Sequence, residues 1–526
     1  MSATLQDRLD DINENIVDIA DFNERVVGAY NRGAGELELD AEIQTARSVI
    51  PAGTGALRDF SYIAPDIPEF IGENCVGCMD CVTQCPDTAI LAKVIEPDTL
   101  ETNLGSLEES GRDKMREQWT DTNKYWKVRE KKGLGGGKFG IFIDPTKCKG
   151  CAECVDACGT HDALKMVRKN KENVDWYRSS FAFFKEAPDT PSKFVNEKAL
   201  SDMMLMEKSL LYVGGAGSCM GCGEATVLRM LMAATGFIYG EKNMGMVAAT
   251  GCNTVYTSTY PYNPYLVSWT NSLFENAPAD AMGIRARWDQ KGWQDKRLWI
   301  VGGDGAMLDI GFQSLSRMLA SGMDIKVLVL DTQVYSNTGG QASTSSFKGQ
   351  NAKFSTHGTV AQGKKENRKE LANICMMHKD VYVAQSTAAH PNHLYKAILE
   401  ANAFPGPAVI NTFTTCQPEH GVADDQAYHQ AKLAADSRSF PVFIYDPRKG
   451  SRIRERLSLV GNPNVKEDWY TNPKTGEQID FTYFARTEGR FSKHFDKDGN
   501  PSEALLSAQE DRLENWRTLQ ELAGIN

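Results

Sequence analysis

Hydrophobic positions between residues 214 and 435 follow two alternating patterns. LWIVGG (298–303) and IKVLVLD (325–331) are short continuous apolar runs, which are typical of strands buried on both faces of a parallel sheet. Between them, four apolar residues keep helical spacing: Leu308, Phe312, Leu315 and Leu319. A strand, helix, strand unit of this kind predicts an α/β domain with a parallel sheet.

Elsewhere the periodicity is weaker. An amphipathic helix is predicted near the N-terminus by Leu5, Leu9, Ile12, Ile16 and Ile19. The charged segment 107–132 is expected to be a solvent-exposed helix, and 502–524 a terminal helix. The predicted division is an N-terminal helical and linker segment (1–70), a cysteine-rich α+β domain with a charged insertion at about 95–140 (71–170), an irregular linker (171–213), the α/β domain (214–435) and a charged, irregular C-terminal extension (436–526).

Composition narrows the class of protein. A chain of 526 residues is too long for one core and should hold two or three domains. No apolar run approaches the roughly 18 residues of a membrane span, and the N-terminus lacks an apolar signal core, so export and membrane insertion are not expected. The net charge of −11 disfavours nucleic acid and anionic membranes as main partners.

Two cysteine runs share the spacing C-x2-C-x2-C-x3-C. They are Cys75, Cys78, Cys81 and Cys85, and Cys148, Cys151, Cys154 and Cys158. Three thiolates at this spacing bind one face of a [4Fe–4S] cluster, and the fourth reaches the other cluster of a two-cluster ferredoxin domain. We therefore expect Cys158 to complete the first cluster and Cys85 the second. Structural zinc is disfavoured, because it usually takes two separated pairs of ligands.

The chain has 13 cysteines, and their clustering without a signal peptide favours metal ligation in a reducing cytoplasm over disulfides. The charged segment between the two runs could dock a redox partner or be a solvated decoration.

A third set of cysteines surrounds the α/β domain. GAGSCMGCGE (215–224) places Cys219 and Cys222 in a glycine-rich loop that opens a helix. Cys252 and Cys416 each follow a short apolar segment, where strand ends should converge, so the four can complete a third cluster. Cys375 is left over and is expected to be a buried structural thiol.

A phosphate and metal site is predicted at the ends of two neighbouring strands. Gly303, Asp304 and Gly305 follow one strand and open a helix, where glycines admit a phosphate and a carboxylate can hold Mg²⁺. The next strand leads into Thr332 and Asn337, so Asp304 and Thr332 can ligate one ion. A nucleotide site at these strand ends is the alternative. GLGGGKFG (133–140) lacks the Ser or Thr of a phosphate loop and is expected to be a flexible connector.

Taken together, these motifs resemble the pyruvate:ferredoxin oxidoreductases, within the 2-oxoacid:ferredoxin oxidoreductase family. The resemblance covers roughly residues 70 to 447. Besides the doubled cysteine run it is carried, in family order, by CMGCGE, ATGCNT, NSLFENA, GGDGAMLDIG, LASG, VLDTQVYSNTGGQ, FPGPAVI and FPVFIYDPR.

The resemblance implies three [4Fe–4S] clusters, thiamine diphosphate and Mg²⁺. Asp304, Thr332 and the Val334 carbonyl would hold Mg²⁺, and Asn337 would lie near the thiazolium as a catalytic residue. The cofactor-binding residues it implies are Gly303, Asp304, Gly305, Thr332, Val334, Asn337, Cys222, Glu224 and Cys252, and the ligands of the cluster nearest the cofactor are Cys219, Cys222, Cys252 and Cys416.

The implied activity is the reversible, coenzyme A-dependent oxidative decarboxylation of pyruvate, with ferredoxin or flavodoxin as acceptor. 2-Oxoglutarate is the alternative substrate. A pure electron-transfer protein would leave the GDG and VYSNTGGQ motifs unexplained, and a non-redox thiamine enzyme would leave the cysteines unexplained. No segment matches the family's pyrimidine-activating domain or its remaining coenzyme A surface, so we expect a separate subunit and a dimer of heterodimers.

Overall fold

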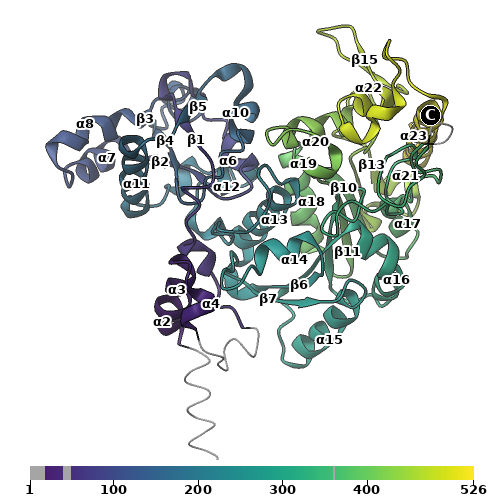
Figure 1. Ribbon diagram of the computed structural model, residues 1–526, viewed down its shortest axis with the longest axis horizontal. Helices are drawn as coiled ribbons and strands as arrows, with labels where there is room; N and C mark the ends of the chain where they lie inside the picture. The colour runs from purple at the N-terminus through teal and green to yellow at the C-terminus, as the bar shows by residue number, and fades with distance from the viewer. Residues whose placement is uncertain (1–17, 40–48, 359–361, 526) are drawn as a thin grey trace, which may run out of the picture.

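The computed structural model describes residues 18–39, 49–358 and 362–525. In Figure 1 a cysteine-rich part lies beside a larger part built around one sheet, and helix α13 (Gly223–Tyr239) lies between them. No helix among the described residues is both long and apolar enough to cross a membrane.

The larger part is an eight-stranded sheet of order β13-β12-β10-β11-β9-β8-β6-β7. Strands β6 to β11 are parallel, whereas β12 and β13 are antiparallel at one end. The bounds are β6 (Met244–Ala249), β7 (Ser268–Ser272), β8 (Arg297–Gly303), β9 (Lys326–Asp331), β10 (Tyr382–Thr387), β11 (Ala408–Phe413), β12 (Phe443–Tyr445) and β13 (Leu457–Ser458). The two apolar runs seen in the sequence are therefore the neighbouring strands β8 and β9.

Both faces of this sheet are covered, which explains why its strands are continuously apolar. Along β8, Trp299 and Val301 join one hydrophobic core, and Leu298 and Ile300 join another on the opposite face. The helices of this part are α13, α14 (Cys252–Thr257), α15 (Ala277–Gln290), α16 (Phe312–Ala320), α17 (Leu371–Met376), α18 (Pro391–Ala403), α19 (Gln417–His420) and α20 (Ala427–Asp436). The predicted α/β architecture with a mostly parallel sheet is confirmed.

The cysteine-rich part contains two small antiparallel sheets, β2-β4-β3 and β1-β5. Short helices α6 (Asp80–Gln84) and α10 (Glu153–Cys158) form the second half of each cysteine run. The other elements are β1 (Asp66–Phe70), β2 (Ile90–Ile95), α7 (Pro97–Leu104), α8 (Glu109–Glu117), β3 (Trp119–Thr120), α9 (Val128–Lys131), β4 (Lys138–Ile143), β5 (Leu164–Arg168), α11 (Lys171–Glu186) and α12 (Leu200–Met203).

Two predictions for this part are wrong. Segment 107–132 is not one solvated helix. It contains helix α8 and strand β3 and then turns again, because Met115, Trp119 and Tyr125 are buried against the small sheet. The glycine-rich stretch after it leads directly into β4. The predicted linker instead begins with the 16-residue helix α11, whose Phe183 and Phe184 pack in the same core as Trp119.

The two ends of the chain also differ from expectation. Residues 1–17 lie outside the described residues, so most of the predicted N-terminal helix is untested, and helical turns run from α2 (Ile19–Asp21) to α3 (Gly28–Asn31). The extension after residue 435 is not irregular, because β12 and β13 extend the main sheet. It ends with α22 (Phe481–Arg486) and α23 (Glu503–Ala523), the second of which confirms the predicted terminal helix.

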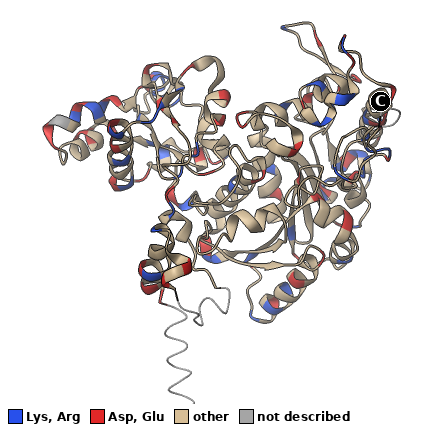
Figure 2. Cartoon of the chain, in the orientation of Figure 1, with Lys and Arg blue, Asp and Glu red and all other residues tan. Residues whose placement is uncertain are grey.

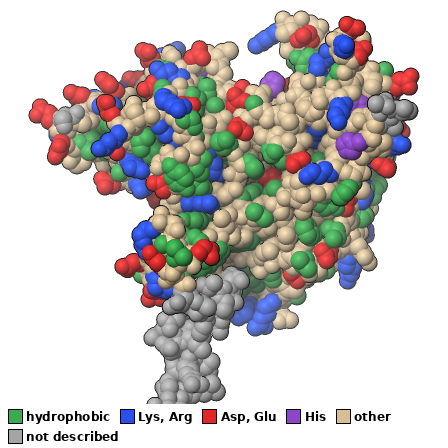
Figure 3. All heavy atoms as spheres, in the orientation of Figure 1, with side chains coloured by type: hydrophobic (Ala, Val, Ile, Leu, Met, Phe, Trp, Pro, Cys, Tyr) green, Lys and Arg blue, Asp and Glu red, His purple; other side chains and the backbone are tan. Residues whose placement is uncertain are grey.

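Charge is spread over the surface helices of both parts, whereas the main sheet carries few charged residues (Figure 2). On the face shown in Figure 3, acidic and basic side chains are interspersed and form no large patch of one sign. This distribution is unlike the basic stripe that nucleic-acid-binding proteins present.

Candidate functional site

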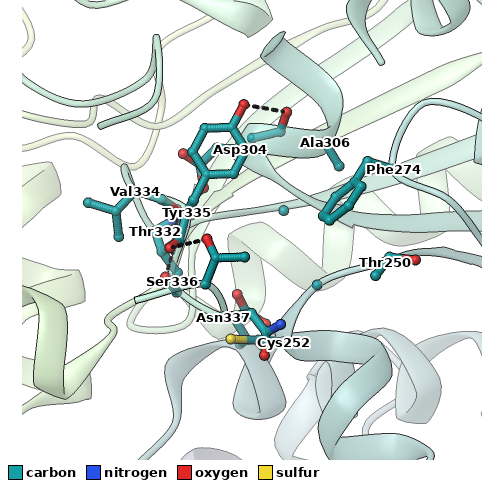
Figure 4. Close-up of a pocket in the computed structure, with 15 residues that line it drawn as sticks. Thr250, Cys252, Phe274, Asp304, Ala306, Thr332, Val334, Tyr335, Ser336 and Asn337 are labelled. Carbon is teal, nitrogen blue, oxygen red and sulfur yellow. Dashed lines mark hydrogen bonds between the residues drawn. The ribbon is translucent and has the colours of Figure 1, made fainter. Parts of the chain in front are cut away.

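The ends of β8 and β9 bring Asp304 and Thr332 into contact. The Thr332 hydroxyl lies 3.2 Å from Asp304 Oδ1 and 3.1 Å from the Val334 carbonyl oxygen, so it can donate to either. The Thr332 backbone amide also donates to Asp304 Oδ1, at 3.3 Å. The Thr332 hydroxyl therefore lies near both an Asp304 carboxylate oxygen and the Val334 carbonyl oxygen, at the ends of two neighbouring strands (Figure 4).

This oxygen set suits Mg²⁺. Octahedral ligands at 2.0–2.1 Å from the ion lie about 3.0 Å from one another, close to the 3.1 and 3.2 Å that separate these oxygens. One carboxylate, one hydroxyl and one carbonyl are hard ligands of the kind that Mg²⁺ prefers. The residues present therefore fit the ion that the sequence implied.

Two serines hold the Asp304 carboxylate from behind. Ser343 and Ser345 donate their hydroxyls to Asp304 Oδ2 at 2.5 and 2.6 Å. Burial, with the nearby Asp331 charge, raises the pKa of Asp304 to about 7, although these two hydrogen bonds oppose the shift. A buried carboxylate in this state gains most from a cation, because the cation offsets the lost hydration.

A pocket opens beside these oxygens (Figure 4). It is lined by Glu224, Thr250, Gly251, Cys252, Phe274, Gly303, Asp304, Gly305, Ala306, Thr332, Val334, Tyr335, Ser336, Asn337 and Thr338. Gly305 leaves no room for a side chain, because a Cβ there would lie 2.2 Å from the Tyr335 ring. Every residue predicted to bind the cofactor except Cys222 lines this pocket.

Glu224 enters the pocket from the first turn of α13. Burial and the Asp304 charge raise the pKa of Glu224 to about 8, so its carboxyl is mostly protonated at neutral pH. Its Oε2 atom is buried and has no hydrogen-bond partner. A protonated carboxyl with a free oxygen can bind a polar group of a cofactor in the pocket.

The third cysteine set surrounds a second cavity of about 160 Å³, lined by Cys219, Cys222, Cys252 and Cys416 among others. Glu224, Cys252, Thr332, Ser336 and Asn337 line both cavities. Cys252 begins α14 after β6, and Cys416 follows β11, so the predicted convergence of strand ends is what brings them together. Cys375 is buried elsewhere, on α17, as expected.

The two cysteine runs sort into the groups that the ferredoxin spacing predicts. Cys85, Cys148, Cys151 and Cys154 line one small cavity. Burial raises the pKa of Cys81, and the charges of the nearby thiols Cys75, Cys78 and Cys158 add to that shift. Burial raises the pKa of Cys75 to about 11 and of Cys148 to about 12, so buried thiolates here need a strongly cationic ligand such as iron.

Two groups of thiols line cavities rather than meet at one point: Cys85, Cys148, Cys151 and Cys154, and the third cysteine set. Within the described residues, no three His, Cys, Asp or Glu side chains meet closely enough to hold a single metal ion. A [4Fe–4S] cube, held at its corners by four separated thiolates, suits such an arrangement.

Several residues of the site were not predicted. Ser343 and Ser345 lie in the polar loop after β9, and Thr250 and Phe274 follow β6 and β7. His420, at the end of α19, lies with its Nε2 atom 2.8 Å from the Thr332 carbonyl oxygen. A lone serine or histidine in a loop has no spacing signature, so only the position of the strand ends could have suggested them.

Comparison with known proteins gives one matching domain model and a consistent set of relatives. Residues 249–412 match the model of the thiamine pyrophosphate enzyme, C-terminal TPP binding domain. The chain is 29% identical over 518 residues to the probable pyruvate-flavodoxin oxidoreductase of Escherichia coli, covering 84% of this chain and 41% of that protein. It is 26% identical to the pyruvate-flavodoxin oxidoreductase of Rhodospirillum rubrum, covering 88% and 42%, and 28% identical to the pyruvate:ferredoxin oxidoreductase of Moorella thermoacetica, covering 85% and 42%.

The chain thus spans about two fifths of the length of these relatives. Among solved structures, the 2-oxoglutarate:ferredoxin oxidoreductase of Magnetococcus marinus matches 38% of this chain and 64% of its own chain, at 23% identity and a TM-score of 0.33. The resemblance to pyruvate oxidoreductases with a thiamine diphosphate domain, predicted from the motifs, is confirmed by the sequence relatives.

Proposed function

We propose that this chain carries the thiamine diphosphate site and the electron path of a pyruvate:ferredoxin or pyruvate:flavodoxin oxidoreductase. The reaction is the coenzyme A-dependent, reversible oxidation of pyruvate to acetyl-coenzyme A and carbon dioxide, with two electrons leaving one at a time. Its main support is the wall of five residues shared by the Asp304 pocket and the cavity of the third cysteine group. A site that binds carbon substrates next to a site for single-electron transfer serves this chemistry directly.

Each group of residues has a separate task in this proposal. Asp304, Thr332 and the Val334 carbonyl hold Mg²⁺, and Ser343 and Ser345 fix the orientation of the carboxylate. Thiamine diphosphate, when bound, supplies the carbanion chemistry that decarboxylation requires. Asn337, which lines both cavities, orients the reacting substrate beside the third cysteine group.

Three [4Fe–4S] clusters form the proposed electron path. The first cluster has Cys75, Cys78, Cys81 and Cys158 as ligands, the second Cys85, Cys148, Cys151 and Cys154, and the third Cys219, Cys222, Cys252 and Cys416. Such clusters, when bound, accept and donate single electrons. Pyruvate is the proposed substrate because the relatives that cover most of this chain are pyruvate oxidoreductases.

We propose further that a separate subunit, in a dimer of heterodimers, supplies the groups that activate the pyrimidine ring and the rest of the coenzyme A surface. Apolar side chains at the site are exposed in a way that a partner would cover: Leu273 is 58% exposed next to Phe274, and Val255 is 51% exposed at the cavity of the third cysteine group. Bound thiamine can react only after a base has acted on it. Among the described residues that line the pocket, Glu224 is the only one with a carboxyl besides Asp304.

The proposal is tested by cofactor content and turnover of the anaerobically purified protein. We expect about twelve irons with matching acid-labile sulfide, and about one thiamine, per chain. The chain alone should be brown and reducible by dithionite yet nearly inactive, and should oxidise pyruvate only with its partner, coenzyme A and a one-electron dye. Iron without thiamine would indicate an electron-transfer protein, and thiamine without iron would indicate a non-redox enzyme. A preference for 2-oxoglutarate would overturn the assignment of pyruvate as the substrate.

A further inference from the structure

Arg229 is a buried cation on the helix that joins the two parts of the molecule. It is 2% exposed and lies on α13, which starts immediately after Cys222 of the third cysteine group. From Cys222 to Arg229 the helix rises about 10 Å. Arg229 therefore lies where the α/β domain meets the cysteine-rich part.

Its guanidinium contacts the segment that connects the first two cysteine groups. Nη1 of Arg229 donates to the carbonyl oxygens of Val82 and Cys85, the second at 2.9 Å. These carbonyls belong to the C-terminal end of α6, which a cation favours. Helix capping is therefore the simplest role that Arg229 could have.

Capping does not balance the charge, however. Nη2 of Arg229 is buried and has no hydrogen-bond partner. The nearby carboxylate Asp87 is already paired with Lys149 at 2.7 Å, with both side chains less than 5% exposed. Burial lowers the pKa of Arg229, and the charges of Cys85, Tyr212 and Asp87 oppose that shift.

A buried cation without a carboxylate of its own is costly, unless another anion lies beside it. A [4Fe–4S] cluster with four thiolate ligands is such an anion, because the thiolates carry more negative charge than the oxidised core carries positive. Reduction adds one further negative charge. A fixed cation nearby therefore stabilises the reduced cluster more than the oxidised one.

We propose that Arg229 is the counter-charge of the cluster held by Cys85, Cys148, Cys151 and Cys154, and that it raises the reduction potential of that cluster. Electrons that arrive at the cluster of Cys222 are thereby drawn along α13 toward the cysteine-rich part. This inference rests on the proposed function only in requiring that the cysteines hold clusters. Arg229 is a positioning and tuning residue, since it contacts ligand carbonyls and no substrate.

Three variants of the full chain separate charge from capping. Arg229→Gln keeps a hydrogen-bond donor and removes the charge, whereas Arg229→Lys keeps the charge. Thr226→Val is the matched control, because Thr226 lies one turn earlier on α13 and carries no charge. Its hydroxyl lies 3.4 Å from the Gln84 carbonyl, in the same α6 segment, and 3.2 Å from the Cys222 carbonyl of its own helix. Each protein is titrated anaerobically with dithionite and redox mediators, and the clusters are followed by electron paramagnetic resonance.

We expect Arg229→Gln to make one cluster at least tenfold harder to reduce, a fall of about 59 mV for a one-electron couple. Arg229→Lys and Thr226→Val should stay close to wild type. Loss of iron in the Gln variant alone would also support the proposal, since the charge would then be needed to hold the cluster. Unchanged potentials in an iron-replete Gln variant, or equal loss of iron in the Gln and Lys variants, would overturn it. A wild-type chain without iron would instead contradict the proposed function.

Discussion

The Nε2 atom of His420 lies 2.8 Å from the carbonyl oxygen of Thr332, one of the proposed Mg²⁺ ligands. Burial lowers the pKa of His420 well below its usual value, so the ring is neutral and Nε2 can donate to that carbonyl. Behind it, Nδ1 lies 3.6 Å from Glu488, which pairs with Arg490 at 2.6 Å. Glu488 and Arg490 belong to the C-terminal extension, which therefore supports the cofactor loop from behind.

Arg490 holds the turn between two of the proposed metal ligands. Its Nη1 donates to Gln333 Oε1 at 3.1 Å, and Gln333, between Thr332 and Val334, has a positive φ of 58°. Arg490→Leu should lower the free energy of unfolding by about 1–3 kcal/mol, because Glu488, whose pKa burial already raises to about 7, would then take up a proton and stay buried without its partner. It should also weaken binding of thiamine diphosphate with Mg²⁺, as measured by calorimetric titration.

The control for this variant is Arg517→Leu, since Arg517 pairs with Asp468 at 2.6 Å on the exposed side of the same extension. A surface pair of this kind contributes less than about 1 kcal/mol. Equal losses of stability in the two variants, with unchanged cofactor affinity in both, would contradict a supporting role for Arg490.

Asp304 should be indispensable for metal binding. Asp304→Asn keeps the size of the side chain and removes its charge, so Mg²⁺-dependent affinity for thiamine diphosphate should fall by at least about 100-fold, or ~2.8 kcal/mol. Iron content should not change, because no cysteine group contacts this carboxyl. Asp309→Asn is a suitable control: Asp309 accepts from Tyr335 at 2.9 Å in the same segment but does not line the pocket. Full thiamine occupancy in Asp304→Asn would disprove the assignment.

Cys416 should be needed for one cluster only. Cys416→Ser should remove about four of the twelve expected irons and the signal of the cluster next to thiamine, while the two ferredoxin-type signals persist. Decarboxylation without electron delivery to the acceptor is then expected. Cys375→Ser, a change at the buried thiol outside the three groups, should keep all the iron. If Cys375→Ser loses the cluster and Cys416→Ser keeps it, the fourth ligand has been assigned wrongly.

The sequence predicted those parts of the molecule whose chemistry imposes a spacing. Asp304 and Thr332 could be paired because two apolar runs with one helix between them become adjacent parallel strands. Trp119, in contrast, lies in a strongly charged segment, and nothing local indicates that it packs against Phe142 of β4. Glu488 could not be foreseen either. It lies more than 150 residues after the loop that it supports, and it is buried only because the C-terminal extension folds back onto that loop.

His393 gives the fold a defined sensitivity to acid. The ring lies between α18 and β10, with Nδ1 2.9 Å from the Ser386 hydroxyl and Nε2 buried without a partner. Burial, followed by the charges of His390 and Lys396, lowers the pKa of His393 from 6.5 to about 3. Between pH 6.5 and pH 3 the unfolded chain binds a proton at His393 that the folded chain does not. The folded state therefore becomes less stable as the pH falls from 6.5 toward 3.

Between pH 6.5 and about pH 5 this one group should cost about 2 kcal/mol of stability. His393→Gln retains a partner for Ser386 and cannot become charged, so its unfolding free energy should depend less steeply on pH in this range. The measurement is urea unfolding of the two proteins at matched pH values. The difference between their unfolding free energies is compared, because the contribution of the carboxylates that both proteins share then cancels. The chain as purified with its cofactors should be used for both. Parallel curves for His393→Gln and wild type would mean that His393 has the same pKa in the folded and the unfolded chain, and that its burial does not cause the loss of stability in acid.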